Sequence, residues 1–212
     1  MMMEHKSEDK MIVSRKNKKV DPYTIRILEA ARQLFTESGL EAVNMYQIAQ
    51  KAGIGQGSLY RRYSDKGAIC SDLLGNRSES FLTELEFNVL KSPSSASSLE
   101  LLESCIEKVI DFIDEHADLL HLIKSEFVGK GQLTQFEHPI FQSLNAIVVK
   151  LLDQASNAEE IIPIDTQFTA TALISALSPD VYLYQQKVYG SSKQQITAGI
   201  VTLFITGLRK KS

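Results

Sequence analysis

The chain has 212 residues, of which 43% are hydrophobic and 23% charged, with a net charge of −3. Such values are typical of a globular protein with one or two domains and room for a core. No apolar run reaches the ~18 residues that a membrane-spanning helix needs, and the polar N-terminus lacks the apolar segment of a signal peptide. We therefore expect a cytoplasmic protein with no membrane partner.

The charges are unevenly divided along the chain. Residues 1–70 hold 12 Lys and Arg against 8 Asp and Glu, whereas residues 71–212 hold 11 against 18. A basic segment in an acidic protein is the electrostatic pattern of a nucleic-acid-binding domain. The acidic remainder is expected to face away from phosphates.

A polar, lysine-rich segment without periodicity forms residues 1–20 and is predicted to be a disordered basic arm. Arg15 and Lys16 begin a basic cluster directly before the first expected helix. Two interpretations stay open for this cluster. It is either a solvated tail that aids solubility or an arm that contacts DNA phosphates or enters a minor groove.

The first helix is expected to begin at Asp21-Pro22, because an acidic cap followed by proline is typical of a helix N-terminus. Apolar residues at offsets 0, 1, 4, 7 and 8 from Ile27 predict that one face of this helix is buried. Gly39 is expected to end it. We interpret this helix as a support for the two helices that follow.

Two short helices joined by a glycine turn are predicted over residues 44–66. Asn44 can accept a hydrogen bond from an unpaired backbone amide, and Gln47 lies at the reciprocal position of a capping box. Gly53 is placed to end the first helix in a left-handed conformation. The second begins near Gln56 and offers amide, hydroxyl, phenol and guanidinium groups, which a DNA groove and its phosphates require.

Residues 23–74 resemble the DNA-binding domain of the tetracycline-repressor-type (TetR) regulators. The matching segments are ILEAARQLF (27–35), Gly39, IAQKAGI (48–54), GSLYRRY (57–63) and Lys66. The chain departs from the family pattern at Gly55, where Ser or Thr is usual, and at Arg61-Arg62, which replaces a common aromatic-His pair. These departures concern the DNA sequence preference rather than DNA binding itself.

The resemblance and the side chains of the second short helix predict the DNA contacts. We expect Gln56 and Ser58 to reach base edges, and Tyr60 and Lys66 to hold phosphates. The two arginines after Tyr60 could read guanine or only add phosphate affinity. The expected DNA-contacting residues are Arg15, Lys16, Asn44, Met45, Gln56, Gly57, Ser58, Tyr60, Arg61, Arg62 and Lys66.

The remainder of the chain is also predicted to be helical. Ser64 is expected to cap a long helix, and SPSSASS is the clearest linker. The expected ranges are 65–90 for that helix, 92–98 for the linker, and 99–115, 117–128, 136–157, 165–189 and 192–210 for the later helices. The fold class is thus all-α, with about nine helices. A disordered arm (1–20) precedes a three-helix helix-turn-helix DNA-binding domain (21–74) and a larger helical effector-binding and dimerisation domain (75–212).

The last two predicted helices are the most apolar part of the chain, over residues 168–184 and 196–208. Helices that are apolar on most faces must be covered. The resemblance implies that the same two helices of a second copy cover them, in a four-helix bundle across a two-fold axis. A buried monomer core is the alternative. A homodimer of this kind would read a (pseudo)palindromic double-stranded DNA operator.

No group of residues in the sequence is typical of catalysis. There is no phosphate-binding glycine loop, nucleophile elbow or HExxH zinc helix, and His116 and His121 lack the i, i+4 spacing of a metal pair. Cys70 and Cys105 lack metal-ligand spacing and are expected to be thiols, with a redox switch as the alternative. We therefore expect no enzymatic activity, no metal and no cofactor.

An apolar effector pocket between the middle helices is implied by the resemblance, and such pockets carry few polar anchors. Pro179 interrupts an apolar helix. The adjacent Asp180 could anchor a cationic or hydrogen-bonding ligand, or could simply be exposed. The candidate pocket residues are Phe112, Phe127, Phe141, Phe168, Asp180 and Tyr184.

These features predict a homodimeric transcriptional repressor that a small apolar or amphipathic effector releases from its operator. The resemblance implies that an effector that prefers a shifted position of the helix over 65–90 would change the separation of the two DNA-reading helices. One alternative is a regulator, including an activator, that uses no small-molecule effector. Another is a helical small-molecule-binding protein or enzyme with a helix-turn-helix-like beginning.

Overall fold

The computed structural model describes residues 21–90, 96–128, 136 and 138–210. The predicted arm with Arg15 and Lys16 lies outside these residues, as does most of the expected linker. Within the described residues all regular secondary structure is helical, apart from one isolated bridge between Ile161 and Arg209. The all-α prediction is thus confirmed. No helix among the described residues is long and apolar enough to cross a membrane.

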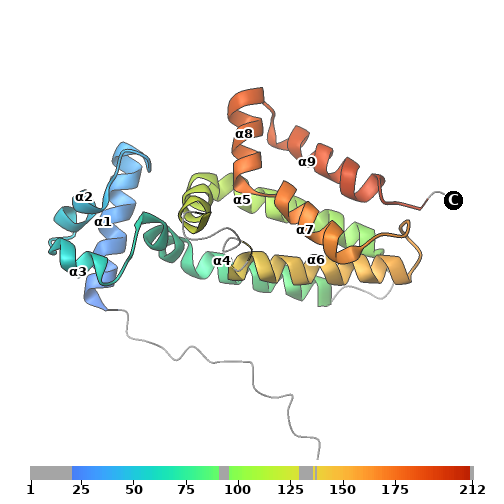
Figure 1. Ribbon diagram of the computed structural model, residues 1–212, viewed down its shortest axis with the longest axis horizontal. Helices are drawn as coiled ribbons and strands as arrows, with labels where there is room; N and C mark the ends of the chain where they lie inside the picture. The colour runs from blue at the N-terminus through green and yellow to red at the C-terminus, as the bar shows by residue number, and fades with distance from the viewer. Residues whose placement is uncertain (1–20, 91–95, 129–135, 137, 211–212) are drawn as a thin grey trace, which may run out of the picture.

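Three helices form an N-terminal unit at one end of an elongated molecule (Figure 1). They are α1 (Pro22–Ser38), α2 (Met45–Lys51) and α3 (Gln56–Tyr60). Asp21 caps α1 by accepting a hydrogen bond from the Tyr23 amide, and Asn44 and Gln47 form the expected capping box of α2. Gly53 has a φ of +64°, as its expected role in ending α2 requires.

The core of this N-terminal unit is the apolar stripe predicted for the first helix. Ile27, Ile48 and Leu59, one from each helix, are completely buried together. Arg26 adds a polar connection, because its Nε donates to the Ala52 carbonyl at 3.0 Å and its Nη2 to the Gly53 carbonyl at 2.9 Å. The turn between α2 and α3 is therefore held against α1.

The long helix α4 (Lys66–Leu90) leads from this unit into the rest of the protein (Figure 1). Its cap is Asp65, whose side chain accepts a hydrogen bond from the Ala68 amide at 2.8 Å. The expectation that Ser64 caps this helix was therefore wrong, because the Ser64 hydroxyl donates to Asp65 instead. Gly75, with a φ of +27°, interrupts the helical backbone at a place where the sequence pattern showed no break.

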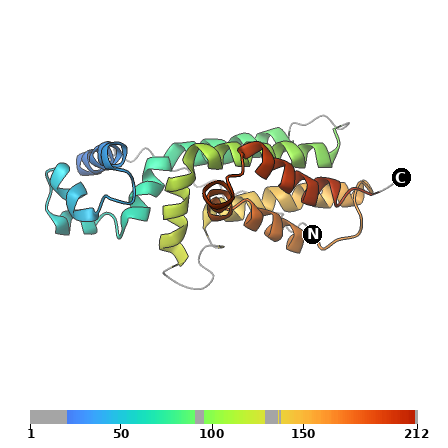
Figure 2. The same ribbon diagram turned by 90° about the horizontal axis from the view of Figure 1, so that it is seen from above.

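The helix α5 (Ser98–Val128) joins the two segments that were expected as separate helices. Its backbone is non-helical at His116, where φ is −128° and ψ is 17°. Beyond that residue the helix turns sharply away from its first part (Figure 2). The expected break at His116 is thus a kink within one element.

Four further helices and a π-helical turn complete the C-terminal domain: α6 (Pro139–Asn157), α7 (Thr166–Ala176), α8 (Pro179–Tyr189), α9 (Lys193–Val201) and η2 (Thr202–Thr206). The expected single helix over 165–189 is divided, because the Ser178 hydroxyl caps α8 and Pro179 begins it. The proline therefore starts a helix rather than bending one. Residues from α4 to η2, including Leu102, Leu151 and Leu173, share one large core.

Candidate DNA interface and effector cavity

The helix α3 presents the polar groups that were expected to face DNA. Leu59 is fully buried, while Gln56, Gly57 and Tyr60 are exposed, Tyr60 with 53% of its surface. Ser58 is half-buried and accepts a hydrogen bond at 2.9 Å from Arg61 Nη2. The hydroxyl and the guanidinium are thus presented together beside the exposed glutamine.

Arg62, which was expected to contact DNA, has partners inside the protein. Its Nε and Nη2 lie 2.8 and 2.7 Å from Asp21 Oδ2. Its Nη1 donates to the Ser58 carbonyl at 3.1 Å, and the guanidinium lies 4.7 Å from the centre of the Tyr23 ring. The hydrogen bond from Arg62 holds the pKa of Asp21 below its usual value. Arg62 therefore ties the end of α3 to the start of α1.

Lys66 also has internal partners. Its ammonium donates to the Leu40 carbonyl at 2.7 Å and to the Val43 carbonyl at 2.9 Å. These carbonyls belong to the loop between α1 and α2. Two of its three donors are thus used within the protein, and the phosphate contact expected for Lys66 stays a prediction.

The helix α2 contributes one exposed side chain that the sequence reasoning missed. Tyr46 has 57% of its surface exposed and follows Met45, which is half-buried against the core of the N-terminal unit. Asn44 uses its side-chain oxygen to cap the helix. The position of Tyr46 outside the buried stripe of Ile48 and Ala49 was the available signal that it faces outward.

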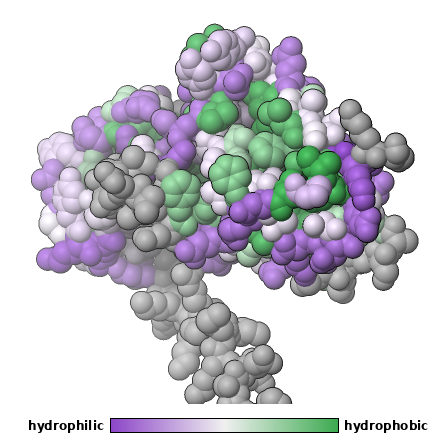
Figure 3. Space-filling model, turned by 45° about the vertical axis from the view of Figure 1, so that its right-hand side comes forward, coloured by the Kyte–Doolittle hydropathy of each residue, from purple (hydrophilic) through white to green (hydrophobic). Residues whose placement is uncertain are grey.

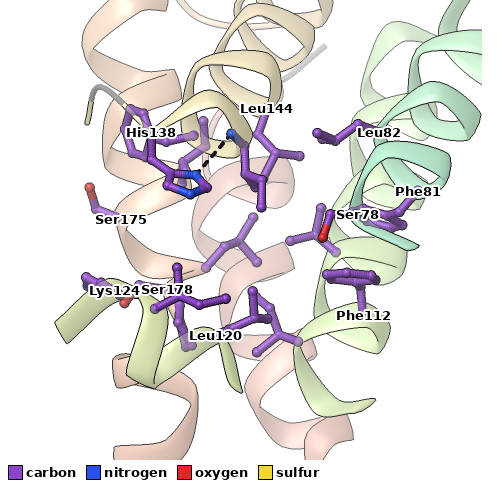
Figure 4. A pocket seen from close by; sticks show the side chains of 18 of the residues that line it. Ser78, Phe81, Leu82, Phe112, Leu120, Lys124, His138, Leu144, Ser175 and Ser178 are labelled. Carbon is purple, nitrogen blue, oxygen red and sulfur yellow. Dashed lines mark hydrogen bonds between the residues drawn. The ribbon is translucent and has the colours of Figure 1, made fainter. Parts of the chain in front are cut away.

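A largely apolar cavity of about 250 Å³ lies between α4, α5, α6 and the α7–α8 turn. Phe81 and Phe112 stack in its wall with ring centres 4.4 Å apart, and Phe136 and Phe141 meet edge to face at 5.0 Å. Lys124, Ser175 and Ser178 lie on the side opposite Phe81 and Phe112 (Figure 4). The lining also includes Ser78, Leu82, Val109, Ile113, Leu120, Ile123, His138, Ile140, Leu144, Ile174, Leu177 and Pro179.

Most polar groups of this cavity already have partners. The Ser175 hydroxyl donates to the Thr171 carbonyl, and His138 Nδ1 accepts from the Ile140 amide. Burial lowers the pKa of His138, so its imidazole is neutral at pH 7. In the part of the chain that the structure describes, Lys124 is the one Lys or Arg in the cavity wall.

The Lys124 ammonium contacts a carboxylate of another helix. Lys124 Nζ lies 2.5 Å from Asp180 Oδ2, and His121 Nδ1 lies 2.5 Å from Asp180 Oδ1. Burial raises the pKa of Asp180, but the hydrogen bonds from Lys124 and His121 outweigh it, so the net shift is downward. Asp180 is therefore an ionised carboxylate held by two residues of the kinked end of α5.

The predicted pocket residues divide into three groups. Phe112 and Phe141 line the cavity as expected. Phe168 and Tyr184 do not, since α7 and α8 turn them outward with 72% and 52% of their surfaces exposed. Asp180 lies behind Lys124 rather than in the wall, and the side chain of Phe127 is outside the described part of the structure.

Ser78 is a buried cavity residue that the sequence reasoning missed. Leu74, Ser78, Phe81 and Leu85 follow one another at helical spacing on α4. A serine in an otherwise apolar stripe was the signal that could have revealed it. Because Ser78 belongs to α4, a ligand in the cavity would touch the helix that leads to the N-terminal unit.

A small core connects the cavity with the N-terminal unit. Cys70 and Leu74 of α4 are buried against Ile123 of α5. Phe35 and Leu40, from the end of α1 and the following loop, pack on this cluster. Ile123 also lines the cavity. One side chain thus contacts both the cavity and the cluster on which α1 rests.

The two cysteines lie in different cores, Cys70 in this small cluster and Cys105 in the large one. Burial raises the pKa of Cys105 to about 11, which keeps it a protonated thiol at neutral pH. Among the described residues there is no group of three or more His, Cys, Asp or Glu side chains arranged to hold a metal ion.

Comparisons with known proteins agree with the helix-turn-helix geometry. Residues 27–73 match the model of the bacterial regulatory proteins of the tetR family. The HTH-type transcriptional regulator SAB2452 of Staphylococcus aureus (strain bovine RF122 / ET3-1) is 29% identical over 160 residues, which cover 76% of this chain and 80% of that protein.

Two solved structures share the fold. Thermus thermophilus FadR, a TetR-family repressor in complex with lauroyl-CoA, has a TM-score of 0.67 at 16% identity, covering 89% of this chain and 96% of that one. AibR in complex with isovaleryl coenzyme A and operator DNA has a TM-score of 0.60 at 19% identity, covering 87% and 98%. The matching family and the Staphylococcus relative are regulatory, which excludes the enzyme alternative. The chain is thus a transcriptional regulator whose N-terminal part is a DNA-binding domain of the TetR family.

Proposed function

We propose that this regulator is a homodimeric repressor, acting in the cytosol, that a small apolar or amphipathic effector releases from its operator. The observation that carries the proposal is the apolar cavity, whose wall shares Ile123 with the cluster beneath α1. FadR and AibR, which share the fold, are solved with acyl-CoA ligands, and AibR also with operator DNA. Their ligands support an apolar effector here.

DNA recognition is assigned to α3. Two copies of this helix would enter successive major grooves roughly 34–36 Å apart. The exposed Gln56 amide can pair with adenine N6 and N7, and Ser58 with Arg61 would extend the contact to neighbouring bases or phosphates. The exposed phenols of Tyr46 and Tyr60 would hold phosphates. Lys66 and Arg62 would act indirectly, by holding α4 and α1 in position.

The surface of the C-terminal domain supports dimerisation. Phe168 on α7, Val181, Tyr184 and Val188 on α8, and Leu203 on η2 are each at least 40% exposed. Apolar side chains gather on one face of this domain (Figure 3). A second copy would cover such a face. We expect Val188→Asp to give a monomer in light scattering, and an unchanged dimer would refute this interface.

The cavity and the DNA-reading helix can be coupled through α4. An effector against Phe112 and Ile123 would press on the cluster formed by Cys70 and Leu74. A displaced cluster would shift α1 and α4 together, and the separation of the two α3 helices would change. By linkage, the effector and DNA would weaken each other's binding by equal factors.

The test is fluorescence-polarisation binding of the full chain to labelled DNA from directly upstream of its own coding sequence. Random DNA serves as the control, and both are titrated over a salt series. Selective binding that Gln56→Ala weakens and that an effector reverses would support the proposal. Equal binding to both DNAs across all upstream fragments tested would contradict an operator at this site.

A further inference from the structure

The cavity wall contains a carboxylate-binding arrangement that the protein's own Asp180 occupies. Lys124 lines the cavity, and its ammonium lies 2.5 Å from Asp180 Oδ2. Neither partner is sealed from solvent, because the side chain of Lys124 is 28% exposed and that of Asp180 is 41% exposed. A carboxylate entering with an apolar ligand can therefore reach the same ammonium.

We propose that the effector is an apolar carboxylic acid whose tail fills the cavity and whose carboxylate replaces Asp180 on Lys124. This inference rests on the proposed effector function of the cavity and adds the chemistry of the head group. The exchange makes or breaks no covalent bond, since one carboxylate takes the place of another.

The position of the charged group supports this orientation, although Ser78 lies beside Phe81 and Phe112. Lys124, Ser175 and Ser178 lie together on one side of the cavity, whereas Phe81 and Phe112 form the opposite side (Figure 4). A molecule with one charged end and an apolar body would place its charge at Lys124 and its body against the stacked rings. The cavity of about 250 Å³ is small for a ligand site, since such pockets range over ~300–1,000 Å³. A compact acid therefore fits it better than a large conjugate.

Other head groups fit Lys124 less well. A cationic head would meet the Lys124 ammonium while Asp180 is already bound by Lys124 and His121. Lys124 as an anchor for a carboxylate therefore replaces the expectation that Asp180 anchors a cationic ligand. A neutral alcohol cannot compete with a carboxylate for an ammonium. A thioester of coenzyme A brings no charge to this point, because its phosphates are far from the acyl carbonyl.

Displacing Asp180 would have a consequence for α8. Asp180 lies in the first turn of α8, and both of its partners, Lys124 and His121, belong to α5 beyond the kink. Val181, Tyr184 and Val188 on the same helix form the proposed dimer surface. A ligand carboxylate on Lys124 would loosen the connection between α5 and α8. The effector would thereby change how α8 packs against the second copy.

The first experiment is calorimetric titration of the full-length protein with octanoate, octanol, octylammonium and octanoyl-CoA. We expect octanoate to bind about ten-fold or more tightly than octanol, because a charge-assisted hydrogen bond is lost in the alcohol. Octylammonium is expected to bind most weakly. Equal affinities for octanoate and octanol, or no binding of any probe, would overturn the inference. Tighter binding of octanoyl-CoA, unaffected by Lys124→Met, would also overturn it in favour of a conjugate.

Three variants test whether Lys124 is the source of the preference for octanoate over octanol. Lys124→Met keeps the apolar stem and should remove the preference for octanoate over octanol. Asp180→Asn removes the internal competing carboxylate. It should increase the affinity for octanoate several-fold and leave the affinity for octanol unchanged. Lys108→Met is the matched control, since Lys108 also lies on α5 and pairs with a carboxylate of another helix, Glu84, at 3.5 Å. An octanoate preference that survives in Lys124→Met would refute the assignment.

Two controls distinguish a variant that does not fold, or a protein that does not bind its operator, from a wrong assignment of the carboxylate site. Circular dichroism melting of each variant reports the fold, and Lys124→Gln is a second neutral variant if Lys124→Met is unstable. Operator binding measured on the same samples tests the proposed function independently. Selective DNA binding without any preference for octanoate would leave the repressor proposal standing and remove only the carboxylate inference.

Discussion

Lys66, the first residue of α4, donates a 2.7 Å hydrogen bond from its ammonium to the backbone carbonyl of Leu40. Leu40 also packs its side chain on the cluster of Cys70, Leu74 and Ile123. The loop after α1 is thus connected to α4 twice, once by the ammonium and once by apolar contact. A movement of α4 would therefore be passed through this loop to α1 and α2.

Replacing Lys66 by Met should destabilise the N-terminal unit. The Leu40 and Val43 carbonyls would lose a charged donor, which costs about 1–3 kcal/mol of unfolding free energy. DNA affinity should fall with little change in its salt dependence, because the ammonium is held by carbonyls. Urea unfolding and polarisation over a salt series measure both effects. Lys187→Met, which removes an exposed pair with Asp118, is the control. A salt slope reduced by about one would instead restore a direct phosphate contact.

Replacing Gln56 by Ala should relax the choice of DNA sequence. Loss of a bidentate contact to adenine would cost ~1–3 kcal/mol on the operator and leave random DNA unaffected. Arg61→Ala is the variant for comparison. Removing a phosphate contact would lower the affinity for all DNA sequences alike and reduce the salt dependence of binding. Binding to a panel of operator variants measures the difference. If Gln56→Ala weakened operator and random DNA by the same factor, its role in base recognition would be excluded.

The ion pair between Asp21 and Arg62 should make stability depend on acidic pH. The folded-state pKa of Asp21 lies below its ordinary value of 3.8, chiefly because of the hydrogen bond from Arg62. Such a depressed pKa contributes stability that is present above the unfolded-state value and lost as pH falls through the folded-state value. The melting temperature of the wild-type protein at pH 6 should therefore be higher than that of Asp21→Asn. The difference should shrink below pH 4, and a constant difference would argue against the pair.

Filling the cavity should make repression insensitive to the effector. Ser78→Leu places an apolar side chain on the cavity side of α4, where the serine is buried. Operator affinity should be retained while octanoate no longer reduces it. Ser80→Leu, at an exposed position of the same helix, is the matched control. Normal release of DNA from Ser78→Leu by octanoate would show that the effector binds elsewhere.

The local features of the chain could be predicted from the sequence. The caps at Asp21 and Asn44 and the left-handed Gly53 depend on residues within a few positions of one another, so their pattern is visible in the linear chain. The buried stripe beginning at Ile27 likewise follows from helical periodicity. These signals were sufficient for the all-α fold and for the helix-turn-helix unit.

The partners of the charged residues were decided only by the tertiary structure. Lys66 meets Leu40 across 26 positions, Arg62 meets Asp21 across 41, and His121 meets Asp180 across 59. Side-chain type and helical spacing carry no information about contacts at such separations. Phe168 and Tyr184 were expected in the pocket because they are aromatic, yet the packing of α7 and α8 turns them outward. The sequence by itself determined the all-α fold and the two short helices of the helix-turn-helix unit, and it predicts that α3 reads DNA. Which charges are satisfied internally and which side chains enclose the cavity depended on how the helices pack, because that packing brings distant residues together.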